Sequence, residues 1–154
     1  MSVDTAAGTD SGAPAAGTVP HSRMAGLYKR DRACQGLGIT LDTVSTGHAV
    51  MRMTVGAAMV NGHGIAHGGF LFLLADAAFS YACNSYGPVT VAQGAQVTFL
   101  APAAVGDELT AEAVERTRSG RTGVYDVTVR NAAGKVIAEF RGQSVMLAGT
   151  PHTG

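Results

Sequence analysis

One long apolar run divides the chain, and alternating apolar and polar residues lie on both sides of it. Twelve of the fourteen residues from Phe70 to Cys83 are apolar, and only Asp76 and Ser80 interrupt them. The run contains no Val, Ile, Thr, Gly or Pro, so its composition favours helix. A helix that is apolar on every face is a buried helix, and this one is too short to cross a bilayer, which takes about 20 residues. The pattern therefore predicts a long helix in the core of the protein.

The alternating segments predict β-strands with one buried and one solvated face. One segment, residues 48–55, precedes the apolar run, and a short amphipathic helix is predicted before it, from Ser22 to Gly38. Four more segments follow the run: residues 89–100, 107–117, 122–131 and 135–147. Short connections rich in Gly, Pro, Asn and Asp separate these four, which favours antiparallel neighbours.

This order of elements predicts an α+β fold, in which an antiparallel β-sheet wraps around one long central helix. A chain of 154 residues is long enough for one domain with a sizeable core. Residues 1–22 consist mostly of Ala, Gly, Ser, Thr and Pro, and we expect them to form a disordered tail. The folded domain is then predicted to span residues 23–148.

The composition excludes several classes of partner and site. The formal net charge is zero, which argues against nucleic acid or an anionic membrane surface as the main partner. The first 22 residues lack the basic and apolar regions of a signal peptide, so we expect a cytoplasmic protein. Cys34 and Cys83 lie far apart and form no metal-binding spacing, which predicts free core thiols in a reducing compartment.

Asp76 is the first candidate functional residue, because a carboxylate in an apolar helix is costly unless it is paired, hydrogen-bonded or used in chemistry. The alternative is a structural Asp that accepts a hydrogen bond from a neighbouring hydroxyl or amide. Ser80, one turn later, could bond a carboxylate or a water, or could equally bond its own helix backbone.

The glycine-rich segment before the helix, NGHGIAHGG, is the second candidate. The first N–H groups of a helix have no intrahelical partner and favour negative charge, and Gly68 would let a ligand approach them closely. The alternative is that Gly68 and Gly69 only permit a tight entry into the helix. His63 and His67 have the spacing of a metal-ligand pair on a helix, but the glycines around them predict a loop, so no metal site is expected.

The segment NGHGIAHGGFLFLLADAAFSYACNS resembles the loop-and-helix signature of hotdog-fold acyl-CoA thioesterases, and most closely the PaaI-type branch, which is associated with phenylacetic acid degradation. The resemblance runs from about Leu27 to Leu147 and includes GDELTAEA, TGVYDV and VIAEFRG. It implies a hotdog fold and hydrolysis of an acyl-CoA thioester, with phenylacetyl-CoA or its hydroxylated forms as substrates. Coenzyme A would be part of the substrate, so no separate cofactor is expected.

The same resemblance implies roles for individual residues. Asp76 would be the nucleophile or general base, and the backbone N–H of Gly68 would bind the thioester oxygen. Asn61 would hydrogen-bond the thioester carbonyl, although an Asn before Gly is also an ordinary turn residue. His67 would orient the site, without transferring protons itself.

The segment ERTRSGRTG is predicted to be a hairpin turn, and the resemblance places it near the phosphates of coenzyme A. The residues of this predicted phosphate site are Arg118, Ser119, Gly120 and Arg121. Arginine suits phosphate recognition, and the alternative is a solvated turn.

The spacing of Gly68 and Asp76 bears on assembly. Eight residues of helix correspond to about 12 Å of rise, so one thioester carbonyl cannot touch both groups of one chain. If both act, the donor of one protomer must face the carboxylate of another, as in a twofold homodimer with two shared sites. The resemblance likewise implies a homodimer, commonly paired again into a tetramer.

Two other functions remain open at this point. A hotdog-fold enoyl-CoA hydratase or dehydratase would need a His paired with an acid, for which His67 and Asp76 are a poor match. The chain could also be a non-catalytic acyl-CoA-binding module. Neither would release free thiol from acyl-CoA.

Overall fold

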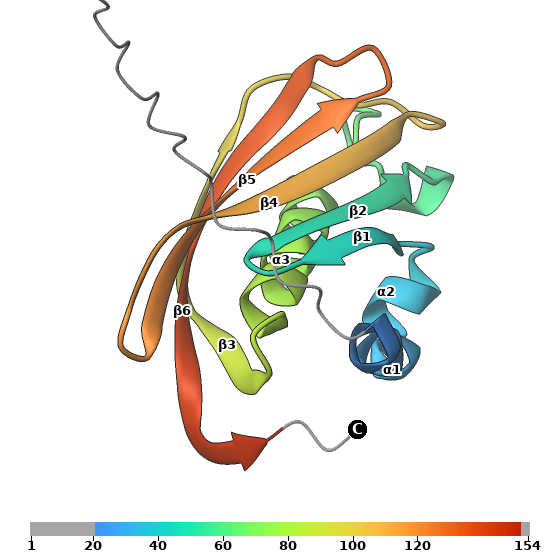
Figure 1. Ribbon diagram of the computed structural model, residues 1–154. Coiled ribbons are helices and arrows are strands. Elements are labelled where there is room, and N and C mark those ends of the chain that lie inside the picture. Colours follow the sequence, from blue (N-terminus) through green and yellow to red (C-terminus); the bar gives the residue numbers. More distant parts are fainter. Residues whose placement is uncertain (1–20, 152–154) are drawn as a thin grey trace, which may run out of the picture.

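The computed structural model describes residues 21–151, which form one curved antiparallel sheet around a long helix (Figure 1). The helices are α1 (His21–Arg30), α2 (Arg32–Gly36), the 3-10 helix η1 (Ala57–Met59) and α3 (Gly68–Asn84). The strands are β1 (Thr40–Ser45), β2 (His48–Thr54), β3 (Pro88–Phe99), β4 (Glu108–Ser119), β5 (Thr122–Asn131) and β6 (Val136–Pro151). Their order in the sheet is β1-β2-β4-β5-β6-β3, so the predicted α+β hotdog architecture is confirmed.

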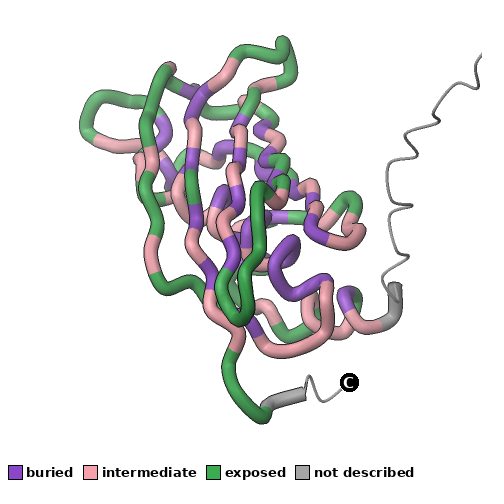
Figure 2. Tube along the Cα trace, turned by 60° about the vertical axis from the view of Figure 1, so that its left-hand side comes forward, coloured by how far each residue is buried: buried purple, intermediate pink, exposed green. Residues whose placement is uncertain are grey.

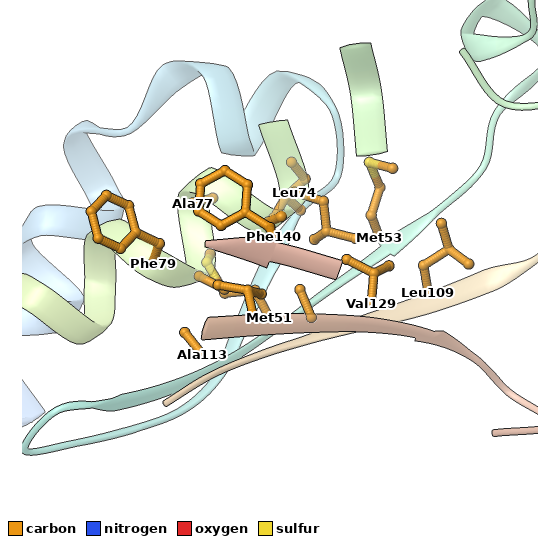
Figure 3. Close-up of a cluster of buried hydrophobic side chains, with 14 of the residues drawn as sticks. Met51, Met53, Leu74, Ala77, Phe79, Leu109, Ala113, Val129 and Phe140 are labelled. Carbon is orange, nitrogen blue, oxygen red and sulfur yellow. The ribbon is translucent and has the colours of Figure 1, made fainter. Parts of the chain in front are cut away.

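The core lies between α3 and the concave face of the sheet. Ten side chains of α3 are buried, and the alternating apolar residues of β2, β4, β5 and β6 face them (Figures 2 and 3). Phe79 of α3 packs edge-on against Tyr125 of β5, with 5.5 Å between the ring centroids. Gly142 of β6 leaves the room for this packing, because a Cβ there would lie 2.8 Å from the Phe79 ring.

Strand β3 lies at one edge of the sheet. It pairs with β6 from Pro88 to Phe99, and no other strand among residues 21–151 pairs with it. Its residues from Val91 onward are exposed or only partly buried, and Val91 and Phe99 are 40% and 50% exposed. A long edge strand with apolar side chains is a ready surface for pairing with another chain.

The N-terminal region differs from the prediction. In place of one helix from Ser22 to Gly38 there are two, because Asp31 leaves helical geometry and caps α2 by accepting a hydrogen bond from the Cys34 backbone N–H at 3.0 Å. The Tyr81 hydroxyl of α3 donates to the other oxygen of the same carboxylate at 3.2 Å. Asp31 therefore ties the N-terminal helices to the central helix, a contact between distant positions that the local pattern does not encode.

Strand β1 was not predicted, because its residues do not alternate between buried and exposed. It forms an antiparallel pair with β2 through the turn at Gly47, whose φ of 70° favours glycine. Of the predicted tail, residues 1–20 lie outside the described part of the chain, and His21 and Ser22 belong to α1. No helix within residues 21–151 is long and apolar enough to span a membrane.

Candidate active site

Helix α3 has one face that is not fully buried. The partly buried or exposed residues of this open face are Gly69, Phe72, Leu73, Asp76 and Ser80. These positions recur every three or four residues, which places them in one stripe along the helix. The expectation that α3 is buried on every face is therefore corrected. Asp76 lies midway along the open face and is partly buried rather than enclosed by the core.

Within residues 21–151 the Asp76 carboxylate makes no hydrogen bond or ion pair. Burial raises its pKa above the ordinary 3.8, because the charged form loses hydration that no group in the described part of the chain replaces. The structural alternative, an Asp held by a neighbouring hydroxyl or amide, is not what the chain forms. An unpaired carboxylate of raised pKa is suited to accept a proton or to attack an electrophile.

The two cysteines near Asp76 are inert thiols. Burial is the main cause that raises the pKa of Cys34 and of Cys83 to about 12, and the nearby charge of Asp76 adds to the effect in both. Both side chains are 2% exposed and free of disulfide. A thiol with so high a pKa carries almost no thiolate at neutral pH, so the site offers Asp76 and not a cysteine as its reactive group.

His67 caps the N-terminus of α3. Its Nδ1 accepts a hydrogen bond from the Gly69 N–H at 3.2 Å, and its carbonyl accepts one from the Phe70 N–H at 3.0 Å. The ring nitrogen that faces the helix thus acts as the acceptor of the cap. The Gly68 N–H, which directly precedes the two capped amides, has no hydrogen-bond partner among the residues described. It is thus a free donor at the positive end of the helix dipole.

Gly68 is closely packed against the side chain of Phe99. A Cβ there would lie 2.8 Å from Cζ of Phe99, whose ring lies over the start of α3. Tight packing, which was the alternative explanation for the two glycines, therefore applies to Gly68. It is compatible with a role for the free Gly68 N–H as a hydrogen-bond donor to a ligand.

Asn61 organises the loop before the helix. Its Oδ1 accepts hydrogen bonds from the backbone N–H groups of His63, at 2.9 Å, and Ile65, at 3.4 Å. Because the oxygen is used in this way, the Nδ2 group is left to donate. His63 is exposed, and no three His, Cys, Asp or Glu side chains in the described region gather closely enough to hold a metal ion.

A cavity of about 810 Å³ opens at the N-terminus of α3 and brings together three of the predicted site residues, Asn61, His67 and Gly68. Its remaining wall is mostly apolar: Ile65, Ala66, Gly69, Leu71, Phe72, Phe99, Leu100, Ala101 and Pro102. Sequence reasoning missed the wall at the end of β3. Phe99 and Leu100 are 50% and 57% exposed, and their exposure becomes visible only in the folded chain. Asp76 does not line this cavity in its own chain.

The predicted coenzyme A hairpin lies at the other end of α3. The Arg118 guanidinium stacks on the Tyr86 ring, 3.6 Å from its centroid, just beyond the C-terminus of the helix. Arg121 donates two hydrogen bonds to the Met146 carbonyl, at 2.7 and 2.9 Å, and Gly120 forms the turn with a φ of 58°. A helix of 17 residues is about 25 Å long, so the hairpin is far from the Gly68 cavity of the same chain.

Known proteins are similar in sequence to this chain over the residues that form the candidate site. A thioesterase superfamily profile matches residues 63–138, which include Gly68 and Asp76. The acyl-coenzyme A thioesterase PaaI of Escherichia coli is 47% identical over 124 residues, covering 80% of this chain and 89% of that protein. A putative esterase of Archaeoglobus fulgidus is 34% identical and covers 75% of each chain.

Solved structures agree in fold. The structure of the Escherichia coli PaaI protein from the phenylacetic acid degradation operon superposes with a TM-score of 0.82 at 45% identity, covering 84% of this chain and 94% of that one. A Streptococcus mutans protein bound to acetyl CoA gives a TM-score of 0.68 at 25% identity, with 71% and 88% covered. The chain therefore belongs to the thioesterase superfamily and is a thioester hydrolase of the hotdog fold.

Proposed function

We propose that the protein hydrolyses acyl-CoA thioesters of arylacetic acids, such as phenylacetyl-CoA or its hydroxylated forms, to the free acid and coenzyme A. The observation that carries the proposal is the pairing of two unsatisfied groups, the Gly68 N–H beside an apolar cavity and the Asp76 carboxylate on the same helix. The PaaI relatives, named for acyl-coenzyme A and for phenylacetic acid degradation, support the choice of substrate.

In the proposed reaction the thioester oxygen binds the Gly68 N–H and the Nδ2 group of Asn61. Both are donors, and both strengthen their bonds as negative charge develops on that oxygen. We assign His67 an orienting role: its Nδ1 holds the helix cap and so fixes the amides that follow Gly68. Asp76 attacks the carbonyl carbon or removes a proton from the water that does so.

The proposed site needs two chains. Gly68 and Asp76 are separated by about 12 Å of helix, whereas reacting groups must approach within about 3–3.5 Å. A homodimer formed along the exposed edge of β3 would cover the open face of α3 and allow the Asp76 of one protomer to face the Gly68 of the other. A pairing of two such dimers into a tetramer is also part of the proposal.

An aromatic acyl group fits the lining of the cavity. Phe72 and Phe99 supply two rings to its wall, and apolar residues flank them. Aromatic side chains favour offset or edge-on contact with a second ring, which contributes about 0.5–1.5 kcal/mol beyond the area buried. The other aromatic residues of α3 do not line this cavity: Phe79 and Tyr81 are buried in the core, and Phe70 is partly buried outside the cavity wall.

For coenzyme A we propose contact with the hairpin residues Arg118, Ser119, Gly120 and Arg121. In an extended substrate the phosphates lie far from the thioester, which is consistent with a basic hairpin at the far end of α3. The Streptococcus mutans relative bound to acetyl CoA supports coenzyme A as the ligand class.

Release of free thiol from a panel of acyl-CoA substrates tests the proposal. Phenylacetyl-CoA and its hydroxylated forms should give the highest kcat/KM, straight-chain acyl-CoAs a lower value, and Asp76→Ala no turnover while remaining folded. A hydratase, dehydratase or non-catalytic binder would release no thiol from any substrate. Near-normal turnover by D76A would show that the carboxylate is not the reactive group.

A further inference from the structure

The side chain of Arg118 stacks on an aromatic ring beyond the C-terminal end of α3. Its guanidinium carbon lies over the Tyr86 ring, 3.6 Å from the ring centroid. Tyr86 lies two residues after the last residue of α3, and Arg118 comes from the last part of β4. A guanidinium is planar, so one that covers a ring on one side presents a second face on the other. Arg118 is exposed, which leaves this second face open to a ligand.

The ring beneath Arg118 is held in place by a carboxylate. The Tyr86 hydroxyl donates a hydrogen bond to Glu115 Oε2 at 2.8 Å, and the Tyr125 hydroxyl donates to the same oxygen at 2.9 Å. Tyr125 is a core residue, so the core anchors the stack. Arg118 forms no salt bridge with any residue between 21 and 151. The Arg118–Tyr86 stack is therefore a fixed cationic surface that no ion pair occupies.

The stack is within reach of the thioester for one of the two chains at a shared site. From Asp76 to Asn84, at the end of the helix, α3 rises about 12 Å, whereas the whole helix from Gly68 is about 25 Å long. The pantetheine arm of coenzyme A is roughly as long as four extended amino-acid residues, or about 14 Å. Such an arm spans the first distance and not the second. The hairpin that can serve a site therefore belongs to the protomer that supplies Asp76.

We propose that the Arg118–Tyr86 stack is a platform for the adenine ring of coenzyme A, in the protomer that supplies Asp76. This inference rests on the proposed function, and it assigns to Arg118 the base of the nucleotide in place of the phosphates. Adenine is planar and aromatic, and it follows the pyrophosphate at the end of the pantetheine arm. On the open face of Arg118 it would place the cation between two π systems, an arrangement that favours stacking without base-specific hydrogen bonds.

The neighbouring Arg121 is placed differently, which suits it to the phosphates. Its Nε and Nη2 both donate to the Met146 carbonyl, so its guanidinium is held against β6. Its Nη1 and the Ser119 hydroxyl make no hydrogen bond in the part of the chain that the structure describes. These are the donors that the hairpin offers to a pyrophosphate, whereas Arg118 offers a stacking surface.

Steady-state kinetics of Arg118→Lys distinguish a platform from a phosphate ligand, because lysine keeps the charge and loses the planar face. R118K should raise KM for phenylacetyl-CoA by about tenfold, which is typical for the loss of one stacked base, with kcat within about twofold of wild type. The same increase is expected with the 3′-dephospho-CoA thioester, which keeps the adenine. With phenylacetyl-4′-phosphopantetheine, which has a phosphate but no adenosine, the KM values of R118K and wild type should converge.

Two variants of Tyr86 and one distant arginine serve as controls. Tyr86→Leu removes the ring beneath the guanidinium and should raise KM as R118K does, whereas Tyr86→Phe keeps the ring and should retain most of the affinity. Arg130→Lys alters an exposed arginine at the opposite end of β5 and should keep the wild-type KM for every substrate. Circular dichroism checks that each variant folds. R118K decides the question even if Y86L does not fold, because Arg118 is exposed.

A mixed dimer tests which chain carries the platform. When Asp76→Ala and Gly68→Val chains are paired, the one intact site takes Asp76 from the Gly68→Val chain. Adding Arg118→Lys to that chain should raise KM for phenylacetyl-CoA. An increase only when Arg118→Lys is on the other chain would overturn the assignment.

The platform is refuted if R118K keeps the wild-type KM for phenylacetyl-CoA, or if its increase in KM persists with the phosphopantetheine thioester. Failure of the proposed function gives a different result, namely a wild-type protein that releases no thiol from any acyl-CoA. An active wild type whose KM is indifferent to Arg118→Lys refutes this inference alone.

Discussion

A mixed dimer of two inactive variants should be active if each site takes Gly68 from one chain and Asp76 from the other. Asp76→Ala removes the carboxylate and leaves the donor. Gly68→Val places a branched side chain where even a Cβ would lie 2.8 Å from Phe99. Phe99 is half exposed on an edge strand, so its ring can turn aside and the chain should still fold, although the substrate's approach to the N–H is blocked. We expect the Val variant to lose at least the 10²–10³-fold typical of a lost oxyanion donor.

The expected recovery follows from twofold symmetry. In a mixed dimer both lesions fall in one site, and the other site keeps the wild-type Asp76 and Gly68. Each mixed dimer should therefore have about half of wild-type activity, and random mixing, which makes about half of all dimers mixed, should give about one quarter overall. Two affinity tags, one on each variant, allow mixed dimers to be purified and assayed for thiol release.

Circular dichroism and size-exclusion chromatography must first show that both variants fold and associate. A purified mixed dimer whose activity equals that of the two inactive parents would refute the shared site. Gly68 and Asp76 would then act in different steps, or one of them would not act in the reaction.

Three further perturbations test other parts of the structure. Asp76→Asn should be more stable than wild type at neutral pH and equally stable below pH 3.8. The Asp76 carboxyl has its raised pKa in the folded state, so wild-type stability is lost as pH rises from 3.8 through the pKa of the folded state. Equal urea unfolding curves for the two proteins at pH 7 would contradict this. Arg118→Ala should raise KM for phenylacetyl-CoA more than it lowers kcat and should leave a short pantetheine thioester unaffected; equal effects on both substrates would remove Arg118 from coenzyme A binding. Gly142→Ala should lower the free energy of unfolding by about 1–3 kcal/mol, because its Cβ would lie 2.8 Å from the buried Phe79 ring. The control Gly36→Ala, whose Cβ would have no atom within 4 Å, should change the free energy of unfolding by less than about 1 kcal/mol.

The elements that the sequence predicted well are those whose side chains alternate or whose composition is uniform. The strand at residues 122–131 was predicted to the residue, and α3 extends the apolar run by two residues at its start and one at its end. The missed strand β1 has no alternation, because its outer position beside β2 leaves all six of its residues exposed or half-buried. At Asp31 the side chain caps α2, and the second partner of its carboxylate is Tyr81, fifty positions later, which no local pattern contains.

The candidate site residues could also be predicted only in part. The polar residues in the apolar run and the glycines before it identified Asp76 and Gly68, because each is costly or unusual where it stands. Whether the Asp76 carboxylate was paired could not be decided without the fold, since Ser80 could bond it or its own backbone and any other partner lies elsewhere in the chain. The cavity wall at Phe99 and Leu100 was missed for a related reason: an apolar strand end has no chemistry of its own until it is folded against the start of α3.

The open face of α3 links the proposed assembly to the ionisation of Asp76. A partner that covers this face removes more water from a carboxylate whose pKa burial already raises, so the dimer should hold the Asp76 proton more tightly than the free protomer does. By linkage, the same difference weakens association as pH rises through the pKa range of Asp76, because the charged form must then be desolvated. Sedimentation equilibrium from pH 4 to pH 7 should show a dimer Kd that rises with pH for wild type, against a flatter profile for Asp76→Asn, which cannot ionise. Parallel profiles for the two proteins would mean that the Asp76 carboxylate is not covered by the partner, and a shared active site would then lack its physical basis.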